Sequence, residues 1–299
     1  MARKSKSLAR RPKKLQPSEL TMTFATATVA PAATLRSVID LSQCASILNR
    51  RFYRQGLNWA VAGIKIQSTQ SFTLNCQKLP NTWSISNAWH KTFALWNKQM
   101  EETLEEGGNE SLRARFSDFK IYADFAHVQA GYAGNLLPAD GSGTLIDPTE
   151  FVLHMVGPAA GASKGIIDGY ESSRAFPQSP DPVGPAASSP NNWMSSMFDV
   201  GSANPEILDN AENENDNLPY DQSNYPGGAT QLANLEIHDN AQIYGTSATT
   251  NIGITTCKGG NFPCGLIRLD WVPSADNTSS ASLGILINMI PGDHRGYLA

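Results

Sequence analysis

Short segments with an apolar residue at every second position constrain the fold of this chain more than any other feature of its sequence. The clearest examples lie in RFSDFKIYADFAHVQ (115–129), GLIRLDWVP (265–273) and ASLGILINMIP (281–291). Such alternation is typical of strands with one buried and one exposed face. We therefore predict a strand in each segment, and we expect the polar stretch 274–281 to join the last two strands as a hairpin.

Further strand signals and long polar stretches define the fold class. Residues 59–76 predict one long or two short strands, and FVLHMV (151–156) predicts another short one. Residues 157–192 and 201–231 are rich in Gly, Pro, Asn and Asp, and connections of this length argue against alternating βαβ units. Only 17% of the residues are charged, below the roughly 25% of an average soluble domain. We predict an all-β fold, a single jelly-roll β-sandwich with long surface loops.

One amphipathic helix is predicted as an insertion in this sandwich, between Ser84 and Gly107. Its apolar residues are spaced by three or four positions and form one stripe: Ile85, Trp89, Phe93, Trp96, Met100 and Leu104. The glutamates of its last turns either are solvated or face Arg113 and Arg115. A second segment, LSQCASILNRRFYRQG (41–56), predicts a short helix or turn cluster ending at Gly56. No stretch approaches the roughly 18 apolar residues of a membrane span.

The charges are distributed unevenly along the chain. Residues 1–14 contain no acid and seven bases, namely Arg3, Lys4, Lys6, Arg10, Arg11, Lys13 and Lys14. Because the whole chain has a formal charge of −4, residues 15–299 carry −11. A basic segment with so few apolar residues is expected to be disordered until a polyanion neutralises it. We therefore divide the chain into a disordered arm and neutral tether, 1–33, and a jelly-roll domain, 34–299.

Four interpretations of the arm are open: a nucleic-acid arm, a nuclear localisation signal, a mitochondrial presequence and a solvated tail. Pro12 and the small number of apolar side chains disfavour the amphipathic helix of a presequence. One lysine and arginine cluster can serve both nucleic-acid binding and nuclear import. No aromatic residue lies among these bases, so we expect binding that is independent of base sequence and strongly dependent on salt.

A second basic group follows the predicted short helix. It consists of Arg50, Arg51 and Arg54. Two interpretations remain open: these side chains form surface salt bridges, or they make a second contact with nucleic acid.

Motifs that would indicate an enzyme or a metal site are not found in the sequence. GPAAGASKG (157–165) lacks the register of a phosphate loop, and the five histidines have no partner at ligand spacing. The four cysteines are expected to be buried reduced thiols. The acidic residues within 209–221 lack the ligand pattern of an EF-hand, although a calcium site there stays open. We therefore expect no enzymatic activity and no cofactor.

The order of these features is that of small icosahedral virus coat proteins. RFSDFKIYADFAHVQ (115–129) resembles an early jelly-roll strand in capsid proteins of circoviruses and related small circular Rep-encoding single-stranded DNA viruses. SLGILINMIPG (282–292) is similar to the last strand of that family, and residues 41–56 resemble capsid proteins of circovirus-like genomes. The arm has fewer bases than the arginine tracts of circoviruses, and the body is longer.

The resemblance implies a homo-oligomeric icosahedral (T=1) shell of about 60 subunits, with arms inside and loops outside. It also implies packaging of single-stranded viral DNA, recognition by the host nuclear import machinery, and a location in the virion and, during assembly, in the host nucleus. A coat protein of a noda- or tombus-like positive-strand RNA virus has the same layout. An extracellular jelly-roll lectin or glycan-active enzyme is the alternative from another class.

Overall fold

The structure of the protein is a computed structural model. It describes residues 18–25, 29–31, 33–56, 58–106, 113–147, 149, 153–156, 163–165, 235–245 and 252–291. The strands are β1 (Thr21–Ala25), β2 (Leu35–Asp40), β3 (Asn58–Ser68), β4 (Phe72–Lys78), β5 (His154–Val156), β6 (Ser163–Gly165), β7 (Glu236–Ile243), β8 (Gly253–Pro263), β9 (Leu266–Pro273) and β10 (Leu283–Met289). The helices are α1 (Leu41–Asn49), α2 (Trp83–Glu106) and α3 (Phe125–Ala130), followed by a 3₁₀ turn, Tyr132–Gly134.

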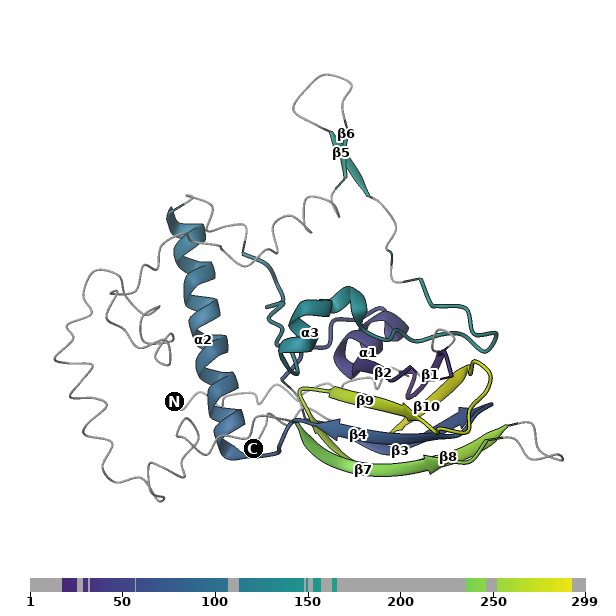
Figure 1. The fold of residues 1–299 in the computed structure, drawn as a ribbon. Helices are drawn as coiled ribbons and strands as arrows, with labels where there is room; N and C mark the ends of the chain where they lie inside the picture. Colours follow the sequence, from purple (N-terminus) through teal and green to yellow (C-terminus); the bar gives the residue numbers. More distant parts are fainter. Residues whose placement is uncertain are drawn as a thin grey trace, which may run out of the picture.

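Eight of these strands form two antiparallel sheets of four, with the orders β1-β10-β3-β8 and β2-β9-β4-β7. The pairing is nested along the sequence, because β1 pairs with β10, β2 with β9, β3 with β8 and β4 with β7. Figure 1 shows the strands of these two sheets lying together, with β5, β6 and α2 away from them. The predicted all-β sandwich is thus confirmed. More than half of the chain, residues 79–235, lies between β4 and β7.

The two sheets bury an apolar core between them. Alternate residues of the strands point inward and are almost fully buried, among them Ile64 and Ile66 of β3, Leu269 and Trp271 of β9, and Ile287 of β10. Burial of such a side chain contributes about 1.5–3 kcal/mol. The sandwich interior is therefore the main apolar source of stability among the described residues. Residues 59–76, predicted to form one long or two short strands, lie in two strands, β3 and β4.

The N-terminal strand corrects the predicted tether. Residues 15–33 were expected to connect the arm to the domain without packing on it, but β1 pairs with β10 over its whole length. Met22 and Phe24 are each only 1% exposed and lie in the core. The tether prediction is therefore wrong for Thr21–Ala25, because two large apolar side chains in this Thr-rich stretch are enough to form an edge strand.

The predicted C-terminal hairpin is also wrong. Both segments are strands, as expected, but β9 pairs with β2 and β4 whereas β10 pairs with β1 and β3. The connection 274–282 therefore crosses from one sheet to the other. Its ends are fixed by backbone hydrogen bonds from Ser274 to Ser71 and between Ala281 and Val29. Alternation predicts which face of each strand is buried, but it does not determine which strands are neighbours.

The strand predicted in 115–129 is not present. Residues 119–123 do alternate between more and less buried side chains, but they have no strand partner among the described residues. The chain then turns into α3, because the side chain of Asp124 accepts a hydrogen bond from the backbone N–H of His127 and caps the helix. Phe125, predicted to share the buried face, is 74% exposed.

The two helices expected from the sequence are present. α1 follows β2 directly, with Asp40 as its N-cap, and it ends at Asn49, seven residues before the predicted limit at Gly56. α2 matches the predicted helix and buries Trp89 and Trp96 in a second apolar cluster, together with Phe119. No helix of the described residues is long and apolar enough to cross a membrane.

Several predictions concern residues outside the described ranges. They are the basic arm 1–14, the acidic segment 209–221, the loop 201–231 and all of the loop 157–192 except Ser163–Gly165. The predicted strand at 151–156 is present in part as β5, which pairs with β6. Glu101 of α2 forms an ion pair with Arg113 at 2.6 Å, so this glutamate takes the second of its two predicted environments.

Candidate functional site

The predicted second basic group begins at the C-terminal end of α1. Arg50 is its C-cap and has a left-handed backbone conformation with φ of 50°. Its guanidinium group donates hydrogen bonds to the carbonyl oxygens of Asp147 and Thr149 at 2.8 and 2.9 Å. Arg50 therefore attaches the segment around residue 147 to the end of α1.

The other two arginines have different surroundings. The guanidinium carbon of Arg54 lies 4.8 Å from the ring centre of Phe93 and 5.5 Å from that of Trp89, both on α2. Such cation–π contacts attract because the face of an aromatic ring is electronegative. Arg51 is exposed. Two of the three arginines thus contribute to packing within the chain, and Arg51 is directed to solvent.

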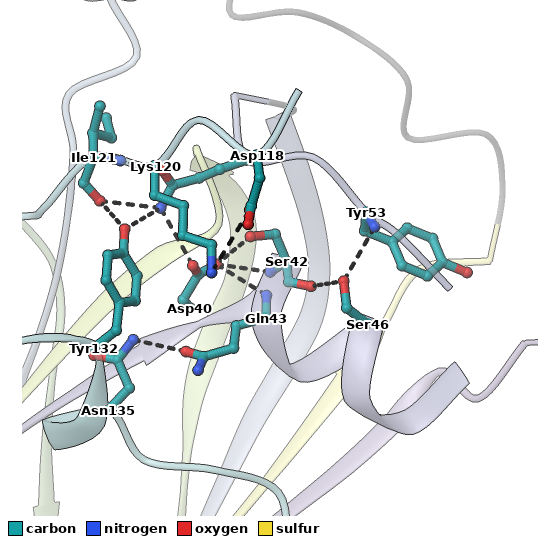
Figure 2. Close-up of polar contacts among 11 residues, drawn as sticks. Asp40, Ser42, Gln43, Ser46, Tyr53, Asp118, Lys120, Ile121, Tyr132 and Asn135 are labelled. Carbon is teal, nitrogen blue, oxygen red and sulfur yellow. Dashed lines mark hydrogen bonds and ion pairs between the residues drawn. The ribbon is translucent and has the colours of Figure 1, made fainter. Parts of the chain in front are cut away.

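A buried polar network surrounds Asp40 (Figure 2). One carboxylate oxygen of Asp40 accepts hydrogen bonds from the backbone N–H groups of Ser42 and Gln43 and from the Ser42 hydroxyl. The other oxygen accepts a bond from the Gln55 amide at 3.3 Å. Burial raises the pKa of Asp40 above its ordinary value, while the hydrogen bonds from Ser42 and Gln43 and the charge of Lys120 oppose the rise.

Gln55 replaces the missing strand partner of the segment 119–123. Its side-chain oxygen accepts a hydrogen bond from the backbone N–H of Ile121 at 2.6 Å, and its amide nitrogen donates to the Ile121 carbonyl at 3.2 Å. The Tyr132 hydroxyl donates to the same carbonyl. Burial is the main cause of the raised pKa of Tyr132. An extended segment is thus held by side chains instead of by a neighbouring strand.

The network continues through α3. The backbone N–H of Ala123 donates to Nδ1 of His127, so Nε2 of the neutral ring carries the proton and donates to Asn135 at 2.8 Å. Asn135 in turn donates to Gln43 of α1 at 2.8 Å. His127 is only 2% exposed, and these bonds account for both ring nitrogens. It is a structural histidine of the core.

Ion pairs fix the same region to the outer face of β9. Arg268 of β9 forms an ion pair with Asp124, the N-cap of α3, and another with Asp270 at 2.8 Å. Asp270 also pairs with Arg36 of β2 at 3.1 Å. Removing one partner of a buried pair leaves the other charge uncompensated. We call residues 113–135 the side layer, because they cover one side of the sandwich and are attached by these bonds.

The network around Asp40 and His127 has a structural role, since its hydrogen bonds link α1 to residues 119–135. Its carboxylates accept bonds from fixed donors, and Cys44, four residues after Asp40, has its thiol pKa raised, mainly by burial. All four cysteines are free and buried, which confirms the predicted reduced thiols. Among the described ranges, no group of three or more His, Cys, Asp or Glu side chains is arranged to hold a metal ion.

One exposed feature near the basic group was not predicted. The rings of Phe52 and Phe116 are stacked, with centres 4.9 Å apart and planes inclined by 21°. The guanidinium carbon of Arg115 lies 5.3 Å from the centre of the Phe116 ring. We call Arg51, Phe52, Arg115 and Phe116 the stacking surface. The sequence indicates one part of this surface, because RRFYR (50–54) places an aromatic residue between bases. It does not indicate that Phe52 pairs with Phe116.

No protein-family model matches the chain, and no curated protein or solved structure matches it. The evidence on function therefore comes from the chain itself. It consists of the nested strand pairing, the separation of charge between the arm and the remaining residues, and the surface contacts described above.

Proposed function

We propose that this chain is a viral coat protein. Its sandwich assembles into a closed icosahedral shell, and its N-terminal arm packages a single-stranded genome. The observation that carries the proposal is the combination of nested eight-strand pairing with a highly basic segment immediately before the first strand. Neither feature alone is specific, because jelly-roll sandwiches occur in both capsid and lectin domains.

The strand order supports a jelly roll. In that fold one long antiparallel hairpin rolls up, so that the first strand pairs with the last, the second with the second-last, and so on inward. Here β1 pairs with β10 and β4 pairs with β7, with the other two pairs between them. The two four-stranded sheets together have four edge strands. The long insertion between β4 and β7 fits a protein whose loops form its binding surfaces.

The charge distribution supports a polyanionic partner. A shell of about 60 copies would bring about 420 positive charges from the arms into one enclosed volume, enough to neutralise a substantial part of a small genome. Residues 15–299 are net negative, which disfavours binding of the same polyanion over the whole surface. A lectin or a glycan-active enzyme has no use for such an arm.

The genome and the site of assembly follow from the resemblance to circovirus-like capsid proteins. We propose single-stranded DNA as the cargo, with RNA as the alternative, and we propose that the arm also directs the protein to the host nucleus. The same cluster of lysines and arginines serves both roles, because import receptors and phosphates both recognise dense positive charge.

Negative-stain microscopy of the purified full-length protein tests the assembly. Regular closed particles support the proposal, and a monomer that persists at high protein concentration contradicts it. A matched variant tests packaging, with all seven bases of the arm changed to glutamine and the length unchanged. We expect its particles to form but to contain little nuclease-protected nucleic acid. Undiminished nucleic acid in these particles would exclude the packaging role of the arm.

A further inference from the structure

We propose that the stacking surface binds single-stranded nucleic acid, with a base stacked on Phe52 and Phe116 and with phosphates contacted by Arg51 and Arg115. The inference rests on the proposed function, since it gives the packaged strand a defined contact on the folded domain. With this contact, binding of nucleic acid depends partly on base stacking, whereas the arm contributes only positive charge.

The two rings are exposed although the chain has a large apolar core. Phe52 is 39% exposed and Phe116 is 47% exposed. They come from segments 64 residues apart, and the two rings stack on each other with Arg115 over the Phe116 ring. A stacked aromatic pair next to guanidinium groups offers a π-face to a base and positive charge to its phosphate, the combination used by proteins that bind single strands.

The surface is held in place before any ligand binds. The left-handed Arg50 turns the chain at the end of α1, and the backbone N–H of Arg51 donates to the Ser46 carbonyl at 3.3 Å. The backbone N–H of Tyr53 donates to the Ser46 hydroxyl oxygen at 3.1 Å. Phe52 therefore lies between two anchored residues, which lowers the entropy cost of stacking a base on its ring.

The partner segment is anchored to α2. The Ser117 hydroxyl donates to the Asn97 side chain at 3.4 Å, and Arg113 pairs with Glu101. These contacts lie on both sides of Phe116 in the sequence. The positive charge of Arg54, held over the rings of α2, lies two residues beyond Phe52. The surface thus combines rigid aromatic rings with several arginines.

The contacts of Glu19, five residues after the arm, favour nucleic acid as the occupant. The backbone N–H of Glu19 donates to the Asn49 side chain at 2.7 Å, and the Asn49 amide donates to the Glu19 carbonyl at 3.4 Å. Asn49 precedes Phe52 by three residues, and Lys14 precedes Glu19 by five. Glu19 is therefore bonded to a residue three positions from Phe52, and the basic residues 1–14 precede Glu19 in the sequence. This closeness in sequence of the basic segment to a residue bonded next to Phe52 favours a polyanion as the occupant.

A single strand fits this surface better than a duplex. In a duplex the base faces are covered by their neighbours, whereas unpaired bases can be stacked on an aromatic side chain. The surface contains no helix or hairpin shaped to enter a groove, so it has no means of reading base edges. We expect little preference for base sequence.

Fluorescence anisotropy of full-length protein with a labelled oligothymidylate of about 12 nucleotides tests the proposal. The variant carries Phe52→Ala and Phe116→Ala, and the matched control carries Phe125→Ala, which removes an exposed phenylalanine from α3. We expect the double variant to bind about 10-fold more weakly and the control to bind like the wild type. Phe52→Tyr, which retains a flat ring, should keep most of the affinity.

The salt dependence separates stacking from charge. Between about 50 and 200 mM salt, the double phenylalanine variant should keep the slope of the wild type, because stacking releases no counterions. Arg51→Gln with Arg115→Gln should reduce the slope by about 0.7 per arginine. This second variant leaves both rings in place, so it tests the surface even if the double phenylalanine variant fails to fold.

The outcomes distinguish this inference from the proposed function. If the wild type binds the oligonucleotide and both the phenylalanine and the arginine variants bind it equally well, the stacking surface is wrong while the packaging role of the arm stands. If the wild type itself does not bind, the proposed function is wrong. If the variants bind normally but lose particle formation, the surface is a contact between copies of the chain and our assignment of nucleic acid is overturned.

Discussion

Between the two sheets, residues that face each other are apolar and almost fully buried, whereas the side layer meets the sandwich largely through polar groups. Trp271 of β9 and Ile64 of β3 belong to the first kind of contact. Gln55 bonding to the backbone of Ile121, and Arg268 pairing with Asp124, belong to the second. Apolar burial adds up over many side chains, while each polar bond adds only about 0.5–1.5 kcal/mol net.

The difference between these two kinds of contact indicates that the side layer detaches before the sandwich unfolds. A region attached by a few polar contacts and one apolar cluster opens at a lower free energy than a sandwich with a continuous core. The stacking surface contains residues of the side layer, so its rigidity depends on that attachment. Variants that act on the two regions separately can therefore test whether the two modes of stabilisation are distinct.

The largest effect is expected in the core. Phe24→Ala should lower the free energy of unfolding by about 3–5 kcal/mol, because β1 is an integral strand of the sandwich. Chemical denaturation measures this change. Thr23→Ala, on the same strand but outside the core, is the matched control and should cost less than about 1 kcal/mol. A small effect of Phe24→Ala would mean that residues 21–25 are a tether after all.

A smaller and more local effect is expected from Gln55→Leu. It leaves the backbone N–H of Ile121 without its partner and removes one donor to Asp40, while the Ile121 carbonyl keeps its bond from Tyr132. We expect a cost of about 1–3 kcal/mol. Hydrogen exchange should accelerate at the amide of Ile121 and stay unchanged at Ile64. Gln67→Leu, the same change on the exposed face of β3, should alter neither amide. Normal exchange at Ile121 in the Gln55 variant would show that other bonds hold the side layer.

The pH dependence tests the buried carboxyl group of the network. Because the pKa of Asp40 is raised in the folded state, folded protein keeps this proton at pH values where unfolded protein has lost it. The contribution of Asp40 to stability is therefore greatest in acid and decreases as the pH rises from about 4 through the folded pKa. Asp40→Asn removes this dependence.

The wild type and Asp40→Asn should be compared by denaturation from about pH 4 to pH 7. The difference in free energy of unfolding should shift in favour of the variant as the pH rises. A shift in favour of the wild type would mean that the bonds from Ser42 and Gln43, together with the charge of Lys120, outweigh burial.

The smallest expected effect is a difference in thiol reactivity between two native cysteines, which report local opening without any substitution. Burial raises the pKa of Cys257 and of Cys264 to about 12, so both should be unreactive toward a thiol reagent near neutral pH. Cys264 contacts the cluster beneath the side layer, whereas Cys257 lies in the sandwich core. In mild denaturant Cys264 should react first. Simultaneous reaction of both thiols would mean that the two regions open together.

Much of the sandwich follows from local sequence patterns. Alternation identified β9 and β10, and the residues of β3 and β4 favoured strands. The sheet to which each strand belongs could not be predicted, because alternation determines which side chains are buried but not which strand lies alongside. The hairpin prediction failed for this reason. β7 and β8 were not predicted, since their alternation is interrupted by polar residues and by Gly259 and Gly260.

The side layer shows a different limit. Residues 119–123 alternate as a strand does, yet the partner of Ile121 is a glutamine side chain 66 residues away. The stacking surface likewise joins residues from two distant segments. Patterns along the sequence report local periodicity, so contacts that depend on a single distant side chain cannot be read from them. The arm residues, by contrast, are predicted from charge alone.

Sedimentation velocity of the full-length protein, detected at one wavelength absorbed mainly by nucleic acid and at another absorbed mainly by protein, tests the central claim most directly. The account predicts one fast boundary with the mass of a closed shell, in which both signals move together. A slow boundary of monomer mass at every protein concentration, or a fast boundary without nucleic acid, would contradict it.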